Sequence, residues 1–227
     1  MKVALYLMNS KGLFTLQNFI KKFGSRAIEY VVAARDLKLE NDAYHELKEV
    51  TNKYDVKFYD RTKFPIEVEQ QFQGYKFSIG WRWLIQNEKN LIVFHDSLLP
   101  KYRGFAPLVN SLINKESLGG VTALMADVKY DCGDILAQKS IPFEYPLKIQ
   151  EAIKKIEPLY FELIADIYQR LLNNEKLLTT KQKDNEATYS PWLDEEDYFI
   201  DWQWPAEKIE RFVNAVGYPY SGAKARL

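Results

Sequence analysis

The chain has 227 residues, with 31 Lys and Arg against 31 Asp and Glu, two His and one Cys. This length allows one sizeable core with an appendage, or two small domains. Because the charges balance, no field concentrates a polyanion, so tRNA and duplex DNA are disfavoured and a small-molecule partner is expected. The lone Cys132 excludes an internal disulfide framework and a cysteine-based zinc cluster, so we expect a reducing compartment and no metal.

The N-terminal stretch MKVALYLMNSKG has too few apolar residues for the core of a signal peptide. No apolar run elsewhere approaches the roughly 20 residues that span a bilayer. We therefore predict a cytoplasmic protein that makes no membrane contact.

Strand-like and helix-like patterns alternate along the first part of the chain, beginning with the apolar run VALYLM and the helical spacing in GLFTLQNFIKKFG. This alternation predicts an α/β fold, a Rossmann-like mostly parallel sheet flanked by helices, that extends to about residue 145. The expected strands are 3–8, 28–35, 56–60, 75–81, 91–96, 121–128 and 134–143. The expected helices are 12–24, 41–54 and 106–116.

The last third of the chain has a different pattern. From Lys148 to Asn174 apolar residues recur at helical period, and we expect Pro158 to kink or break this helix. The polar stretch 174–190 predicts a connector, and a short amphipathic helix is expected at about 205–216. We assign residues 1–180 to one domain, and residues 181–227 form a small C-terminal extension.

The turn after the first strand, MNSKG, contains one glycine. Dinucleotide and phosphate sites on such sheets use a glycine-rich turn there, because only glycine lets backbone N–H groups close around a phosphate. The sequence thus disfavours a nicotinamide dinucleotide, or a phosphate held at this turn.

His95 and Asp96 come at the end of the strand-like run LIVFHD, and a second polar cluster, DVKYDCGD, follows a later strand. Open parallel sheets bind ligands at the carboxyl ends of their strands, so we expect His95 and Asp131 to face one crevice. There the carboxylate would fix the tautomer of the imidazole. The alternative is a partly buried histidine whose hydrogen bonds are satisfied internally. His45 lies in a charged helix and is expected at the surface.

The loop SLLPKYRG and the later stretch GVTALMADVKYDCGDILAQ together resemble the folate-dependent formyltransferase family. Its members include glycinamide ribonucleotide, methionyl-tRNA and sugar-nucleotide N-formyltransferases. The likeness is strong over residues 75–143 and weaker from Trp192 to Ala223. The family places a His before the Ser-Leu-Leu-Pro loop and an Asp in an Asp-x-Gly-Asp turn, and the separation 131 − 95 = 36 agrees with the family's spacing.

The resemblance implies transfer of a formyl group from 10-formyltetrahydrofolate to a primary amine. It implies that His95 and Asp131 are the catalytic pair and that residues 1–180 are the catalytic domain. By position, it also implies folate contacts from the loop before the histidine strand and from the turn before the aspartate, with substrate contacts from Arg103 and Asn110. The implied folate contacts are Trp83, Leu84, Ile85, Leu99, Val128, Lys129 and Tyr130.

Two residues depart from the family pattern. Most members carry an Asn two residues before the His, whose amide donates to the formyl oxygen, and this chain has Val93 there. Asp96 replaces a Pro or Gly. Loss of one such donor costs about 3 to 4 kcal/mol of transition-state stabilisation. Three outcomes stay open: His95 with a backbone N–H suffices, Asp96 or Asn110 substitutes, or the chain has lost the activity and only binds a folate or sugar nucleotide.

The resemblance also narrows the class of amine that accepts the formyl group. The MNSKG turn disfavours glycinamide ribonucleotide, and the balanced charge with no C-terminal barrel disfavours methionyl-tRNA. The remaining class is a nucleotide-linked amino sugar of lipopolysaccharide or glycan biosynthesis, because the tail motifs IDW and GYPYSGA resemble the extension of enzymes that act on it. Another small amine is the alternative. Family members usually continue past this point, so the chain is a natural short form or part of a longer one.

The tail holds three of the five tryptophans of the chain, Trp192, Trp202 and Trp204. We expect these rings to anchor the tail on the core or across a dimer interface, in preference to stacking on a base. A homodimer is therefore expected.

Overall fold

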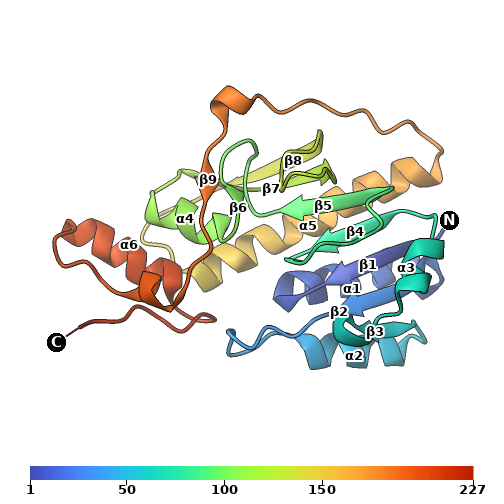
Figure 1. Ribbon diagram of the computed structural model, residues 1–227, viewed down its shortest axis with the longest axis horizontal. Coiled ribbons are helices and arrows are strands. Elements are labelled where there is room, and N and C mark those ends of the chain that lie inside the picture. The colour runs from blue at the N-terminus through green and yellow to red at the C-terminus, as the bar shows by residue number, and fades with distance from the viewer. Residues whose placement is uncertain (227) are drawn as a thin grey trace.

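The computed structural model describes residues 1–226 and is built around a seven-stranded sheet in the order β3-β2-β1-β4-β5-β7-β8 (Figure 1). The first five strands in this order run parallel, whereas β7 is antiparallel to β5 and β8 is antiparallel to β7. A small second sheet pairs β6 with β9. The expected α/β fold, with a mostly parallel sheet flanked by helices, is therefore confirmed.

The elements follow the expected order, with bounds that differ by a few residues. The strands are β1 (Val3–Leu7), β2 (Ile28–Ala33), β3 (Phe58–Asp60), β4 (Lys76–Ile79), β5 (Leu91–His95), β6 (Arg103–Gly104), β7 (Leu118–Met125), β8 (Ile135–Pro142) and β9 (Tyr189–Ser190). The α-helices are α1 (Asn9–Phe23), α2 (Tyr44–Lys53), α3 (Ile66–Gln71), α4 (Pro107–Ile113), α5 (Ile149–Leu172) and α6 (Ala206–Val216). The sequence pattern does not predict α3, because IEVEQQ is short and mostly polar, nor the two-residue strands β6 and β9.

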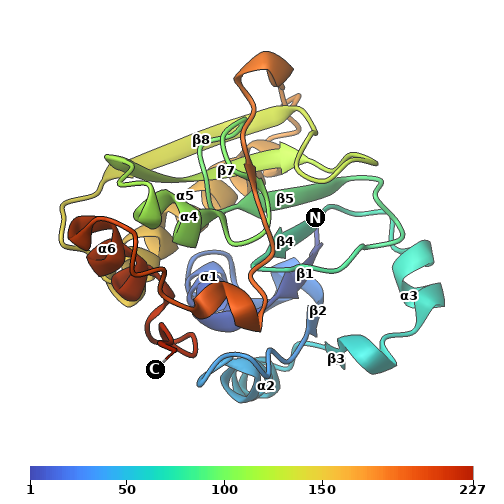
Figure 2. The same cartoon turned by 60° about the vertical axis from the view of Figure 1, so that its left-hand side comes forward.

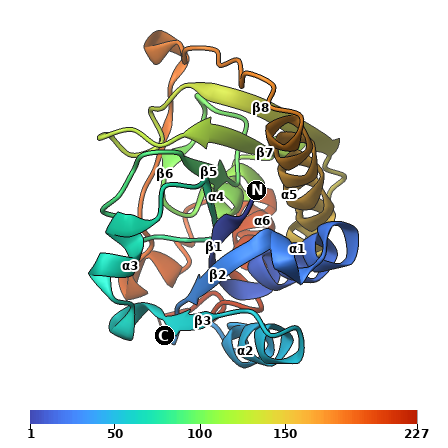
Figure 3. The same ribbon diagram turned by 90° about the vertical axis from the view of Figure 1, so that its right-hand side faces the viewer.

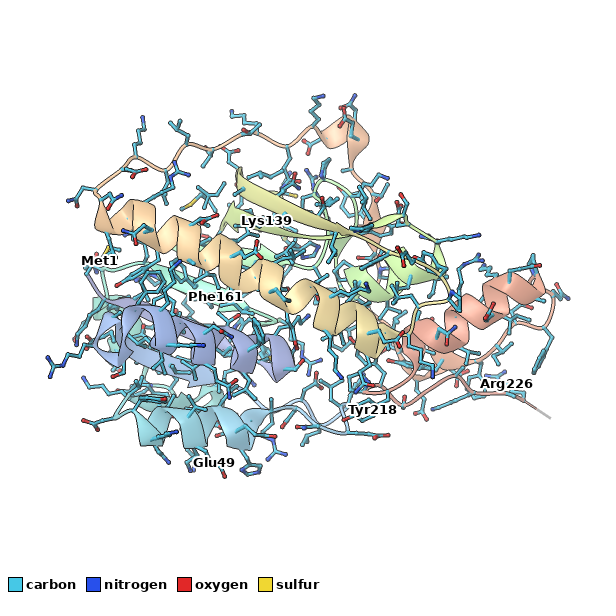
Figure 4. All side chains as sticks on the ribbon, turned by 180° about the vertical axis from the view of Figure 1, so that it is seen from behind. Met1, Glu49, Lys139, Phe161, Tyr218 and Arg226 are labelled. Atoms are coloured by element: carbon cyan, nitrogen blue, oxygen red, sulfur yellow. The ribbon has the colours of Figure 1, made fainter. Side chains whose placement is uncertain are left out.

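The central strand β1 is continuously apolar because the sheet is covered on both faces. All five residues of β1 are buried, as expected for a central strand of a parallel sheet. Helices α1, α2 and α5 lie on one face of the sheet and α3 lies on the other (Figure 3). On the first face α1 and α5 pack side by side (Figure 4). Phe19 of α1 and Ile156 and Leu163 of α5 belong to the resulting core.

Helix α5 runs without interruption from Ile149 to Leu172 and contains Pro158. The expected break at this proline is therefore wrong. An internal proline costs a helix about 3 kcal/mol, but α5 buries apolar side chains both before and after it, among them Ile156 and Leu159. Burial along the whole helix outweighs the lost hydrogen bond. Within residues 1–226, no helix is both long enough and apolar enough to cross a membrane.

The segment after α5 returns across the sheet and ends beside β6. Thr180 bridges to Ile135 at the start of β8, and β9 then pairs with β6. The chain continues past β6 to α6, which packs against α4 (Figure 2). The amphipathic helix expected at about 205–216 is thus confirmed as α6. This path brings the tail to the carboxyl end of β5.

Replacing Ile156 with alanine should destabilise the fold strongly, because this side chain is fully buried between α5 and the sheet. A buried Ile→Ala change costs about 2 to 5 kcal/mol. Urea unfolding followed by circular dichroism measures the loss. The control is Lys154→Ala on the exposed side of the same helix, which should change the unfolding free energy by less than about 0.5 kcal/mol. Equal losses in the two variants would contradict this packing.

Candidate active site

His95 is the last residue of β5, and its side chain is 8% exposed. The ring is held on both sides: Nε2 lies 2.7 Å from the carbonyl oxygen of Tyr102, and Nδ1 lies 3.4 Å from Oδ1 of Asp131. Both partners are acceptors; the contact of Nε2 with Tyr102 has the length of a hydrogen bond, and that of Nδ1 with Asp131 is longer. The sequence expectation that His95 and Asp131 meet therefore agrees with the geometry.

Asp131 reaches His95 by a route that differs from the one expected. Since β7 is antiparallel to β5, the loop after β7 leaves the sheet beside Leu91, at the opposite end of β5 from His95. The loop then folds back, and Asp131 is held there in the left-handed region with φ 53°. Its Oδ2 accepts a hydrogen bond from the backbone N–H of Gly104, 2.9 Å away. The pair is thus assembled by a folded-back loop, and not by a shared sheet edge.

Gly133 fixes the base of this loop. A Cβ atom at this position would lie 1.8 Å from the carbonyl oxygen of Met125, so only glycine allows the close approach of loop and strand. The contact made by Gly133 is thus with the end of β7.

Two cavities meet at His95. The larger, of about 190 Å³, is bordered by tail residues including Trp192 and Tyr220, and we call it the tail cavity. The second, of about 160 Å³, lies between the 81–88 loop and the β7–β8 loop, over the faces of β4, β5 and β7, and we call it the loop cavity. His95, Gly104 and Phe105 line both cavities. A group bound in either cavity would therefore lie next to the imidazole.

The residues expected to contact folate lie in and around the loop cavity. Trp83, Leu84, Ile85 and Tyr130 line it together with Asp131. Val128 is 87% exposed on the same loop, and neither it nor its neighbour Lys129 belongs to the lining.

Leu99 lies elsewhere, as a buried residue of the SLLP loop itself. Its backbone N–H donates to Thr122 Oγ1 at 3.1 Å, and its carbonyl oxygen accepts from Gln138 at 2.8 Å. The structure thus brings four of the seven expected folate residues together at one cavity.

The residues expected to contact the substrate are engaged within the protein. Arg103 is 2% exposed, and its guanidinium donates to Gln182 at 3.0 Å and to Asp184 at 2.9 Å. The Asn110 amide donates to the carbonyl of Ala106 at 2.9 Å. Neither Arg103 nor Asn110 is among the described residues that line the two cavities.

Asp96 lines the tail cavity with its charge already compensated. Its carboxylate forms an ion pair with Lys11 and accepts a hydrogen bond from the Tyr160 hydroxyl. The side chains of Lys11 and Asp96 are only 10% and 12% exposed. Burial and the Asp96 charge raise the pKa of Tyr160, and the same two causes raise that of Tyr220, so both phenols stay neutral donors. The cluster adds no uncompensated negative charge beside His95.

Ser78 on β4 is a polar residue near His95 that sequence reasoning missed. The parallel pairing of β4 and β5 places Ser78 opposite Val93, and both residues line the loop cavity. Its hydroxyl can donate one hydrogen bond. The signal that would have found it is strand register, which the pattern of a single strand does not provide.

Cations and aromatic rings gather at the mouth of the tail cavity. The Arg82 guanidinium lies 5.3 Å and the Lys38 ammonium 5.0 Å from the centre of the Trp192 ring. Trp192 also meets Phe105 edge to face, with ring centres 5.1 Å apart. Arg82 is bound to Asp36 at 2.7 Å. Among residues 1–226, no three His, Cys, Asp or Glu side chains are grouped so that they could hold a metal ion.

Comparison with known families agrees with this site. The family described as formyl transferase matches residues 74–160, and the family described as formyl transferase, C-terminal domain, matches residues 193–227. The chain belongs to the formyl transferase family.

Curated relatives are similar over part of their length. A methionyl-tRNA formyltransferase from Caldanaerobacter subterraneus subsp. tengcongensis is 38% identical over 129 residues, which cover 57% of this chain and 41% of the relative. One from Citrifermentans bemidjiense is 40% identical over 133 residues, which cover 59% of this chain and 41% of the relative. The match thus spans about two fifths of each relative.

Solved structures resemble nearly the whole chain. The N-formyltransferase from Helicobacter canadensis, in complex with folinic acid and dTDP-3-aminofucose, superposes with a TM-score of 0.75 at 19% identity, covering 95% of this chain and 80% of that one. A 4-N formyltransferase from Francisella tularensis gives 0.74 at 21% identity, covering 99% and 91%. WlaRD, a sugar 3N-formyl transferase, gives 0.74 at 18% identity, covering 95% and 78%. At these identities the likeness shows the shared fold.

Replacing Lys11 with methionine should destabilise the protein by about 3 to 5 kcal/mol, because it leaves the Asp96 carboxylate buried without its cation. Lys11→Met combined with Asp96→Asn removes both charges and should recover most of the loss. Urea unfolding of the two single variants and the double variant measures the coupling. Purely additive losses would mean that the ion pair does not form.

Proposed function

We propose that this protein transfers a formyl group from 10-formyltetrahydrofolate to the primary amine of a nucleotide-linked amino sugar. The observation that carries the proposal is that His95, paired with Asp131, lines two adjoining cavities. A donor in one cavity and an acceptor in the other would meet at the imidazole, as transfer between two bound molecules requires.

The loop cavity is the proposed site of the folate. Its walls are mostly apolar and aromatic, with Trp83, Leu84, Ile85 and Tyr130 around a polar end at Asp131, which suits a heteroaromatic ring system with few polar contacts. We assign the pterin to these residues, with Val128 and Lys129 contributing from the exposed side of the β7–β8 loop. Leu99 would anchor the SLLP loop, of which it is part, through its backbone bonds to Thr122 and Gln138. No metal is assigned to the reaction.

The tail cavity is the proposed site of the amine. The Arg82 and Lys38 side chains and the Trp192 ring at its mouth suit an anionic diphosphate attached to a planar base. The H. canadensis enzyme of similar fold was solved with dTDP-3-aminofucose, which supports the same class of substrate here. Residues 1–180 would form the catalytic domain, and the extension 181–227 would close this cavity. A homodimer and a cytoplasmic location stay predictions.

In the proposed reaction the amine nitrogen attacks the formyl carbon, forming a C–N bond and a tetrahedral oxyanion. The bond from this carbon to N10 of the folate then breaks, and the proton lost by the amine reaches N10. His95 would stabilise the oxyanion from its place beside both cavities. Asp131 would hold the ring in place and balance its charge.

A coupled assay tests the proposal. Incubation of the protein with 10-formyltetrahydrofolate and dTDP- or UDP-linked 3-amino or 4-amino sugars should release tetrahydrofolate and a formylated sugar, detected by mass spectrometry. His95→Ala and Asp131→Asn should each lower kcat by about 10² to 10⁴, whereas the exposed His45→Ala should leave it unchanged. Turnover that persists in His95→Ala would show that the chemistry occurs elsewhere.

A second candidate function is a folate-binding or sugar-nucleotide-binding protein of the same fold without catalysis. It is favoured by Val93, which offers no donor, and by the internal partners of both His95 nitrogens. Absence of turnover with every amine, together with binding of 5-formyltetrahydrofolate that is unchanged in His95→Ala, would support it over the enzyme. Turnover with methionyl-tRNA, or with a small amine other than an amino sugar, would support formyl transfer but assign it a different acceptor.

Ser78 is our candidate for the donor that Val93 lacks, since Asp96 and Asn110 already have internal partners. If its hydroxyl binds the formyl oxygen, Ser78→Ala should lower kcat by about 10²-fold with little change in KM. Val93→Asn should raise activity and should restore it in the Ser78→Ala background. Lower activity in Val93→Asn alone would show that the loop cavity has no room for the amide.

A further inference from the structure

Gln182, in the connector after α5, binds the loop that carries Asp131. Its Nε2 donates to the backbone carbonyl of Asp131 at 2.7 Å and to that of Gly133 at 2.8 Å. Both N–H groups of the amide thus have a partner in the same turn. Gln182 is 51 residues away from Asp131 in the chain, and the sequence pattern assigns the connector no role.

Arg103 fixes the orientation of this amide. The Arg103 Nε donates to Oε1 of Gln182 at 3.0 Å, and its guanidinium also binds Asp184 at 2.9 Å. Because a guanidinium only donates, the amide must present its oxygen to Arg103 and its NH₂ group to the turn. Arg103 is almost completely buried, and a buried guanidinium needs such partners. The Gln182 amide therefore has one favourable orientation.

The Gly104 N–H holds the carboxylate of Asp131 directly, but the backbone of the turn has few supports besides Gln182. Asp131 lies in the left-handed region, which is unfavourable for a residue with a side chain. Val128 and Tyr130, its apolar neighbours on the loop, are 87% and 59% exposed, so they hold it little by packing. At the loop base, Gly133 rests against the end of β7. The hydrogen bonds of Gln182 supply the restraint on the opposite side.

We propose that Gln182 and Arg103 are positioning residues that hold the Asp131 carboxylate against His95. This inference rests on the proposed function for its catalytic consequence, although the effect on His95 itself is independent of turnover. It gives Arg103 a role inside the protein in place of the substrate contact expected from the sequence.

Gln182→Glu isolates the contact with the turn. Glutamate has the same shape and can still accept from Arg103, but it cannot donate and sets a negative charge against two carbonyl oxygens. We expect kcat to fall by about tenfold to 10²-fold, since small displacements of catalytic groups have effects of this size, while KM for both substrates stays unchanged. Gln150→Glu on the exposed side of α5 makes the same change of charge and should have no effect.

Histidine NMR provides the test that needs no turnover. The chain has two histidines, so ¹⁵N-histidine labelling gives one set of ring signals from His95 and one from His45. Gln182→Glu should shift the His95 ring signals in the direction seen in Asp131→Asn and leave those of His45 in place. Arg103→Met, which frees the amide to rotate, should shift the same signals.

The outcomes distinguish the positioning role of Gln182 from the proposed formyltransferase activity. His95 signals that do not move in Gln182→Glu, although they move in Asp131→Asn, would overturn the positioning role whatever the activity. A lower melting temperature with unchanged His95 signals and unchanged kcat would likewise overturn it, because Gln182 would then serve folding alone. Shifted His95 signals in a protein that turns over no amine would support the positioning role while contradicting the proposed enzyme.

Discussion

The three-residue segment from Tyr102 to Gly104 holds both members of the candidate catalytic pair. The carbonyl of Tyr102 accepts from His95, and the N–H of Gly104 donates to Asp131. The segment is itself held by the tail, through the pairing of β6 with β9 and a hydrogen bond from Tyr102 to Thr188. A displacement of the tail at β9 would therefore reach the imidazole and the carboxylate together.

The buried charges around the site, those of Lys11, Asp96 and Arg103, are each compensated by a partner. Lys11 pairs with Asp96, and the buried Arg103 donates to the exposed Asp184 and to Gln182, whose amide it orients. Unpaired, each of these groups would be costly to bury. When paired, these groups form polar walls of fixed geometry around the site and create no net electrostatic field. This local balance matches the composition of the chain, in which positive and negative residues are equal in number, and it suits a small ligand better than a polyanion.

Membership of the formyl transferase family and the shared fold do not by themselves decide the acceptor. The curated relatives are methionyl-tRNA formyltransferases matched over about two fifths of their length, whereas the solved structures that resemble nearly the whole chain include sugar N-formyltransferases. The local differences carry more information about this chain. Val93 removes a donor, Ser78 offers another from the neighbouring strand, and Asp96 brings a buried ion pair to the wall of the tail cavity.

Much of the fold could be predicted because its signals are local. The apolar runs of β1 and β5 and the helical period of α5 reflect burial, which the sequence records directly. The break expected at Pro158 was wrong because local propensity competed with burial along the entire helix. For the site, the motif around His95 and the spacing to Asp131 identified the pair, although the reason given from sheet edges was incorrect, since β7 runs antiparallel.

The sequence by itself determined the α/β class, the place of His95 at the end of a buried strand, and the two motifs that mark the family. Only the tertiary structure decided how Asp131 folds back to His95, that Ser78 lies opposite Val93, and that Arg103 binds Gln182 instead of facing a cavity. The physical reason is that periodicity and motifs report on neighbours along the chain. Strand direction, register and side-chain hydrogen bonds between distant segments are fixed only when the whole sheet and its tail are packed.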